Sequence, residues 1–140
     1  MKATIEANGK EIDFFSCHLG WWNDQDEPFK NQVDNLIKHI DNNKLSFLMG
    51  DFNNNALLKD EGYDYIIAQG MIDTYKIAEE KDSGITVKGT IDGWKECSED
   101  KRLDLILSNK EIKVKDSKVI FNRENDIVSD HFGVEINIIL

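Results

Sequence analysis

Four short polar clusters border apolar runs along this chain, and their positions constrain its fold more than any other feature. The clusters occupy residues 16–18, 50–53, 102–104 and 129–131. Each neighbouring run has the length and the aliphatic, aromatic or β-branched residues that are typical of a β-strand. Polar residues at strand ends emerge from the edge of a sheet into solvent, where a site can form without burying unpaired charge. We therefore expect a sheet whose strand ends bring these clusters together.

The signals for the remaining elements are local. Asn8 and Gly9 separate two expected strands, over 3–7 and 10–19, and this dipeptide best tolerates the positive φ angles of a type I′ hairpin turn. Pro28 suits the first turn of a helix, which the apolar spacing extends to Asp41. Further elements are expected over 45–50 (strand), 56–69 (a weaker helix), and 102–108, 113–121 and 133–140 (strands). Residues 71–101 show no regular period, and such long segments often carry specificity.

Length and composition point to one α+β domain over residues 1–140. The chain carries 17 basic and 27 acidic residues, for a net charge of −10, which disfavours a protein that grips long nucleic acid through its phosphates. This balance does not exclude a pocket for one phosphate, and it fits carboxylates that bind divalent cations. The acidity could equally serve solubility alone.

The chain shows no apolar stretch long enough for a membrane span and no apolar core of a signal peptide at its start, so we expect a cytoplasmic protein. Its two cysteines, Cys17 and Cys97, fit no metal-ligand spacing, and in that compartment we expect them to be reduced.

The residues of the polar clusters suit metal-assisted attack of water on a phosphate ester. Asp and Asn oxygens are ligands that Mg²⁺ prefers, and a carboxylate can orient or deprotonate the attacking water. Histidines can donate hydrogen bonds to phosphoryl oxygens, and an aspartate bonded to the far ring nitrogen fixes the tautomer. Each cluster alone has a plainer interpretation: GDFN as a turn, Asp-His as surface residues, His18 as a structural histidine. The specificity comes from all four clusters in this order.

In that order, the motifs SCHLG, LMGDFN, RLDLIL and VSDHFG resemble the endonuclease/exonuclease/phosphatase superfamily of phosphoester hydrolases. The resemblance spans residues 16–133. It implies a four-layered α/β/β/α sandwich, which usually needs about twice this length. The chain is therefore expected to be the C-terminal half of such a domain, with one mostly antiparallel β-sheet and helices on one face.

The resemblance also implies roles for individual residues. Asp51 would orient or activate the nucleophilic water, and Asn53 would hold the phosphate and that water. His131 would contact the scissile phosphate, and Asp104 would pair with His131. His18 would be a second phosphate-facing histidine, donating to the phosphate or the leaving oxygen.

The metal implied by the resemblance is Mg²⁺, with Mn²⁺ as an alternative, and Asp130 would help to hold it. The family's first half would supply further ligands, including a principal glutamate, and this chain starts at the hairpin before His18. We therefore expect a truncated reading frame, a split gene or an expressed fragment, whose isolated activity is weak or absent.

Three segments, 18–30, 73–94 and 101–107, resemble more closely the bacterial sugar-phosphate phosphatases, the branch that includes maltose 6′-phosphate phosphatase. This resemblance implies that aromatic residues stack on a sugar face and that lysines bind the phosphate. The candidates are Trp21, Trp22 and Trp94, with Lys81 or Lys88. The alternative is that the tryptophans pack in the core or a loop and that the lysines are solvated.

The resulting expectation is a metal-dependent phosphoester hydrolase, a sugar-phosphate phosphomonoesterase lacking its N-terminal half. One alternative is an inactive half-domain that forms a homodimer or complements a separate N-terminal half, because a lone half would expose an apolar face. A nuclease is a further alternative. The expected partner is a small phosphorylated substrate, with no membrane and no nucleic acid.

Overall fold

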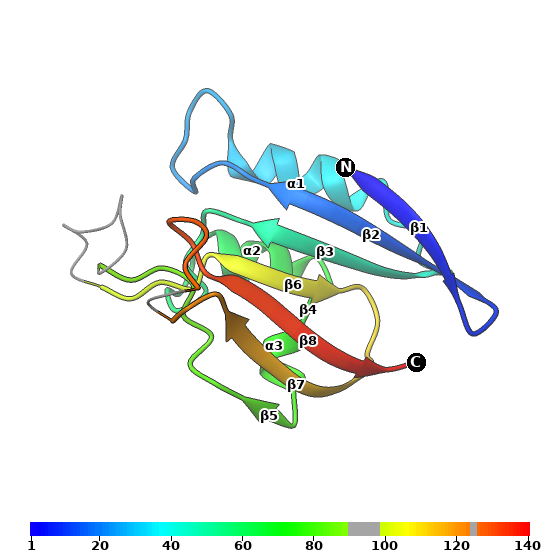
Figure 1. Ribbon diagram of the computed structural model, residues 1–140. Coiled ribbons are helices and arrows are strands. Elements are labelled where there is room, and N and C mark those ends of the chain that lie inside the picture. Colours follow the sequence, from blue (N-terminus) through cyan, green and yellow to red (C-terminus); the bar gives the residue numbers. More distant parts are fainter. Residues whose placement is uncertain (90–98, 124–125) are drawn as a thin grey trace.

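The computed structural model describes residues 1–89, 99–123 and 126–140, which form two β-sheets and three helices (Figure 1). The larger sheet has the strand order β1-β2-β3-β6-β4 and the smaller one the order β5-β7-β8. The larger sheet comprises β1 (Lys2–Ala7), β2 (Lys10–His18), β3 (Leu45–Asp51), β4 (Ile72–Asp73) and β6 (Asp104–Ser108). The smaller sheet comprises β5 (Glu80–Lys81), β7 (Lys113–Ile120) and β8 (Gly133–Ile139).

Two of the three helices cover one face of the larger sheet (Figure 1). They are α1 (Phe29–Ile37) and α2 (Gly62–Ala68), and the short α3 (Thr74–Ile77) follows β4. Phe29 and Val33 of α1 and Ile66 of α2 pack with Phe15 and Leu48 of the sheet in the main apolar core. Because β2 and β3 are joined through α1, they can pair in parallel, as their register shows.

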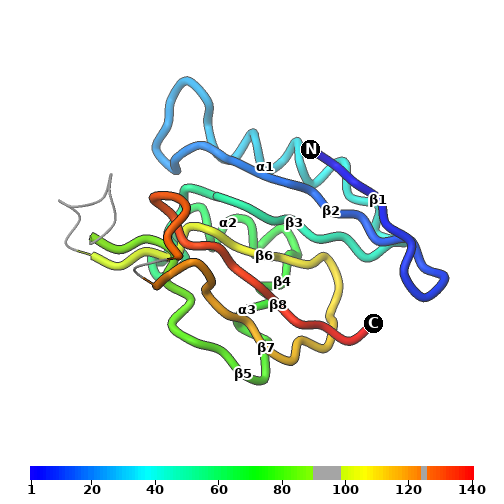
Figure 2. The backbone as a smooth tube through the Cα atoms, in the orientation of Figure 1, coloured from blue at the N-terminus to red at the C-terminus, as the bar shows by residue number. Residues whose placement is uncertain are grey.

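The smaller sheet lies beside the larger one, with β8 running along β6 (Figures 1 and 2). Residues of both sheets, among them Ile106, Val119 and Val134, line one small cavity. The α+β class and the mostly antiparallel pairing are confirmed, since only β2–β3 and β5–β7 pair in parallel among the described strands. The expectation of a single sheet is corrected, because within the described part of the chain β8 packs along β6 and pairs by hydrogen bonds with β7.

Local sequence signals predicted which elements form more accurately than the residues at which each element begins and ends. The hairpin turn has φ angles of 52° at Asn8 and 70° at Gly9, as a type I′ turn requires. The expected helix over 56–69 begins only at Gly62, because the Asn55 side chain accepts a hydrogen bond from the Leu57 amide and favours a turn. Among the described residues, the helices are all too short and too polar to cross a membrane.

Candidate functional site

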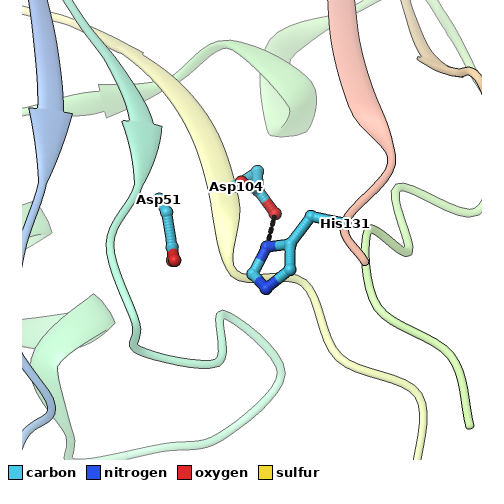
Figure 3. A group of neighbouring side chains, drawn as sticks. All are labelled: Asp51, Asp104 and His131. Atoms are coloured by element: carbon cyan, nitrogen blue, oxygen red, sulfur yellow. Dashed lines mark hydrogen bonds and ion pairs between the residues drawn. The ribbon is translucent and has the colours of Figure 1, made fainter. Parts of the chain in front are cut away.

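The strand register places three predicted site residues in one row across the larger sheet. His18 at the end of β2 pairs with Asp51 at the end of β3, and Asp51 pairs with Asp104 at the start of β6. Directly paired residues project from the same face of a sheet, so these side chains are neighbours. His131 approaches the row from the segment before β8, in the other sheet (Figure 3). The site is therefore built from both sheets.

Asp51, Asp104 and His131 converge at the end of these strands (Figure 3). The Nδ1 atom of His131 lies 2.8 Å from Oδ2 of Asp104, as the resemblance implied. Each of the three residues offers one possible ligand atom, and these atoms lie within 4.8 Å of one another. Nε2 of His18 lies 3.7 Å from Oδ2 of Asp51, but the His18 side chain is 78% exposed.

The turn that carries Asp51 depends on a glycine. Gly50 has a φ angle of +132°, and a Cβ atom there would lie 2.1 Å from the carbonyl oxygen of Cys17 on β2. After the turn, the Asn53 amide donates to Oδ1 of Asp51 at 2.7 Å, and its side chain donates to the Leu19 carbonyl at 2.8 Å. GDFN is thus both a tight turn and the support of a site residue.

Burial raises the pKa of Asp51, and the nearby Asp104 carboxylate raises it further. The Asn53 amide and the two imidazoles, from His131 and His18, lower the pKa in opposition. Two close carboxylates in a partly desolvated site fit a hard divalent cation, whose charge would relieve their repulsion. Asp51 and Asp104 therefore form a donor set that Mg²⁺ or Mn²⁺ can use.

The predicted metal ligand Asp130 is not one of these three converging residues. Asp130 is exposed and accepts a hydrogen bond from the Ser129 hydroxyl at 3.1 Å. It is absent from the converging cluster found among the described residues, where Asp104 stands beside Asp51. Sequence reasoning assigned Asp104 only to His131, and the register of β3 and β6 is the signal that it lacked.

The predicted sugar-binding residues have different surroundings. Trp22 packs against Phe29 in α1 and against Tyr65, whereas Trp21 is exposed. Lys81 donates to a backbone carbonyl, that of residue 76, at 2.8 Å. Lys88 is half-buried, and Trp94 lies outside the described residues.

A buried ion pair anchors the strand that carries Asp104, and sequence reasoning missed it. Nη2 of Arg102 lies 2.5 Å from Oδ2 of Asp73, and both side chains are almost fully buried. The Tyr63 hydroxyl donates to the same carboxylate oxygen at 2.7 Å, and the Tyr75 ring stacks on the guanidinium. Arg102 of the RLD cluster is thus held inside the protein.

The chain matches no model of a protein family and no curated protein, but it matches solved structures. One is an endonuclease/exonuclease/phosphatase family protein from Leptotrichia buccalis, with 45% identity and a TM-score of 0.87 over 99% of this chain and 52% of that one. Another is the Bacteroides thetaiotaomicron mannosyl-6-phosphatase, with 22% identity and a TM-score of 0.69 over 95% of this chain and 53% of that one.

A third match, truncated Caenorhabditis elegans TDP2, has 18% identity and a TM-score of 0.73, and covers 99% of this chain and 58% of that one. The sequence spans about half the length of each of these three structures. The matches below 25% identity share the fold, and that is all they establish. The chain therefore has the fold of the endonuclease/exonuclease/phosphatase superfamily, over about half of the length of these three structures.

Proposed function

We propose that this chain supplies catalytic residues of a metal-dependent phosphoester hydrolase. The observation that carries the proposal is the convergence of Asp51, Asp104 and His131 from two sheets onto one point. Two carboxylates beside an oriented histidine are suited to binding a cation, activating water and meeting a phosphoryl group. The same fold in a family protein 45% identical to this chain supports the reaction class.

Each residue has a role that its contacts permit. Asp51, whose pKa is raised by burial, orients the attacking water and accepts its proton. Asp104 holds His131 through Nδ1, so a protonated imidazole donates from Nε2 to a phosphoryl oxygen. Asn53, whose amide donates to Oδ1 of Asp51, would hold the phosphate and this water. His18, whose Nε2 lies 3.7 Å from Oδ2 of Asp51, would donate to the phosphate or the leaving oxygen.

Mg²⁺ or Mn²⁺, when bound, would polarise the phosphoryl oxygens and neutralise developing charge. Asp51 and Asp104 would hold it. Asp130, which is exposed, stays a proposed additional ligand.

For the substrate, we propose a sugar phosphate that is cleaved as a phosphomonoester. The net charge of −10 disfavours a long nucleic acid, and one solved structure of the same fold is described as a mannosyl-6-phosphatase. Trp21 is exposed close in sequence to His18 and could stack on a sugar face.

The test measures phosphate release from a panel of sugar phosphates with Mg²⁺, Mn²⁺ or EDTA present. We expect metal-dependent release that Asp51→Ala abolishes, with Asp130→Ala showing how much the exposed carboxylate adds. Cleavage of single-stranded DNA into shorter fragments, with no phosphate released from any sugar phosphate, would favour the nuclease alternative. Release that survives Asp51→Ala would contradict the proposed chemistry.

A second candidate is a half-domain that needs a partner, either another copy or a separately encoded N-terminal half. The chain spans about half of its solved relatives, and β1 and β8 are edge strands that carry the exposed apolar residues Ile5 and Ile139. We expect a dimer by light scattering at micromolar concentration, weak activity alone, and higher activity when a separate N-terminal half is supplied. A monomer with full activity would exclude this candidate.

A further inference from the structure

Thr86 lies in a segment that connects the two sheets beside the candidate site. Its side chain is fully buried, and its backbone amide donates to the Lys101 carbonyl at 2.9 Å. The segment is fixed on its other side by Asp82, whose carboxylate accepts hydrogen bonds from the Gly84 and Val119 amides. Residues 82–87 are thus held between the segment leading into β6 and the strand β7.

The Thr86 hydroxyl binds the backbone at the start of β6. Its Oγ1 atom accepts from the amides of Leu103 at 3.1 Å and Asp104 at 3.2 Å. The neighbouring strand β4 reaches only the far end of β6, where it pairs with residues 107 and 108. The hydroxyl oxygen therefore takes the place of a strand partner for the two amides that position Asp104.

The Thr86 backbone binds the other sheet. Its carbonyl accepts from the Phe132 amide at 2.8 Å, and Phe132 directly follows His131. One residue thus bonds to the Asp104 amide with its side chain and to the neighbour of His131 with its backbone. One of these contacts is made at Asp104 and the other next to His131, the two residues that the 2.8 Å hydrogen bond joins across the sheets.

We infer that Thr86 is a positioning residue, which holds Asp104 and His131 at hydrogen-bonding distance across the two sheets. The inference rests on the proposed function in treating this pair as part of the site. The Thr86 hydroxyl acts through the backbone amides of Leu103 and Asp104. A serine keeps this function because it retains the hydroxyl, whereas a valine of similar shape loses it.

The experiment measures the His131 ring rather than turnover, so it gives a result even if the chain is inactive. In the ¹⁵N-labelled chain, the Nδ1 proton of a histidine bonded to a carboxylate gives a downfield resonance that exchanges slowly with water. The comparison uses Thr86→Val and Thr86→Ser, and His131→Gln assigns the signal. Thr74→Val is the matched control, because the buried Thr74 hydroxyl donates to the Ile106 carbonyl on the same strand, away from the site.

We expect Thr86→Val to lose the resonance or to exchange its proton at least tenfold faster, while Thr86→Ser and Thr74→Val retain wild-type behaviour. Thr86→Ala, which leaves room for a water, is judged by the same tenfold criterion if Thr86→Val does not fold. A wild-type resonance and exchange rate in a folded Thr86→Val or Thr86→Ala chain would overturn the inference. Failure of both variants to fold while Thr74→Val folds would also overturn it, by assigning Thr86 to stability alone.

Discussion

At Asp51, burial opposes the charge that the proposed chemistry requires. The raised pKa means that the folded chain binds a proton at Asp51 more tightly than the unfolded chain does. Stability therefore falls as pH rises from the ordinary aspartate pKa, about 3.9, through the raised folded value, and the full penalty is present at neutral pH. A destabilising carboxylate kept at a strand end is typical of a functional residue.

We expect Asp51→Asn to melt at a higher temperature than the wild type at pH 7, because the substitution removes a partly buried charge beside Asp104. The difference should shrink as pH falls through the raised folded pKa, and it should be lost below about 4, where both states of the wild type are protonated. Thermal unfolding followed by circular dichroism between pH 3 and 8 measures it. Asp130→Asn, at an exposed position, serves as the control. A variant less stable than the wild type at pH 7 would contradict this reasoning.

At the same scale, the motifs carried a family resemblance that implied the contact between Asp104 and His131, and the structure has this contact. They could not predict that Asp104 also stands beside Asp51, since this depends on the register between β3 and β6. Thr86 was also missed, because a single threonine in a segment without periodicity carries no signal until its hydrogen-bond partners are known.

Among the elements, β6 depends on the buried Arg102–Asp73 ion pair at its start. Removing one partner leaves a desolvated charge, which typically costs about 3–5 kcal/mol. We expect Arg102→Met to lose free energy of unfolding in this range, measured by urea denaturation. The double variant Arg102→Met/Asp73→Asn should recover part of the loss, because it removes the orphaned charge and keeps an acceptor for the Tyr75 amide. A double variant as unstable as the sum of both single variants would contradict this account.

The close approach of β2 and β3 depends on Gly50. In Gly50→Ala, the unfavourable φ angle costs about 1–3 kcal/mol, and the clash with the Cys17 carbonyl adds an overpacking cost of about 1–3 kcal/mol. Gly70→Ala is the matched control, since Gly70 has a φ angle of +90° but nothing within 4 Å of the added Cβ. Urea denaturation should show a clearly larger loss for Gly50→Ala, and equal losses would rule out the close approach.

The secondary-structure elements show which features local sequence patterns can predict. The Asn8-Gly9 turn and the strands around it follow from local chemistry, and a helix between two strands permits their parallel pairing. α2 begins later than predicted because the Asn55 side chain competes with the backbone for the Leu57 amide. The spacing of apolar residues carries no information about this competition.

For the whole molecule, apolar alternation predicts which segments are strands but not the sheet that each joins. β8 has the alternation of a half-buried strand, which fits pairing in one sheet as well as packing along another. In the structure β8 pairs with β7 in the smaller sheet and also packs along β6 of the larger one. Among the described strands, β1 and β8 are therefore the long edge strands of their sheets. Exposed edges with apolar residues favour pairing with another chain.

Self-association through these edge strands gives a prediction at this scale. Ile5 on β1 is 53% exposed, and Leu57 in the loop before α2 is 56% exposed. The two side chains are thus almost equally exposed but lie in different parts of the molecule, which makes Leu57 a suitable control. Burying an isoleucine contributes about 1.5–3 kcal/mol, and a symmetric dimer contains two copies. If the edge strands form the interface, Ile5→Lys should weaken dimerisation by about 100-fold or more, because every 1.4 kcal/mol is tenfold in the dissociation constant. Sedimentation across a concentration series measures this constant, and Leu57→Lys should leave it unchanged. Equal effects of the two substitutions would show that general surface hydrophobicity, rather than the edge strand β1, drives association.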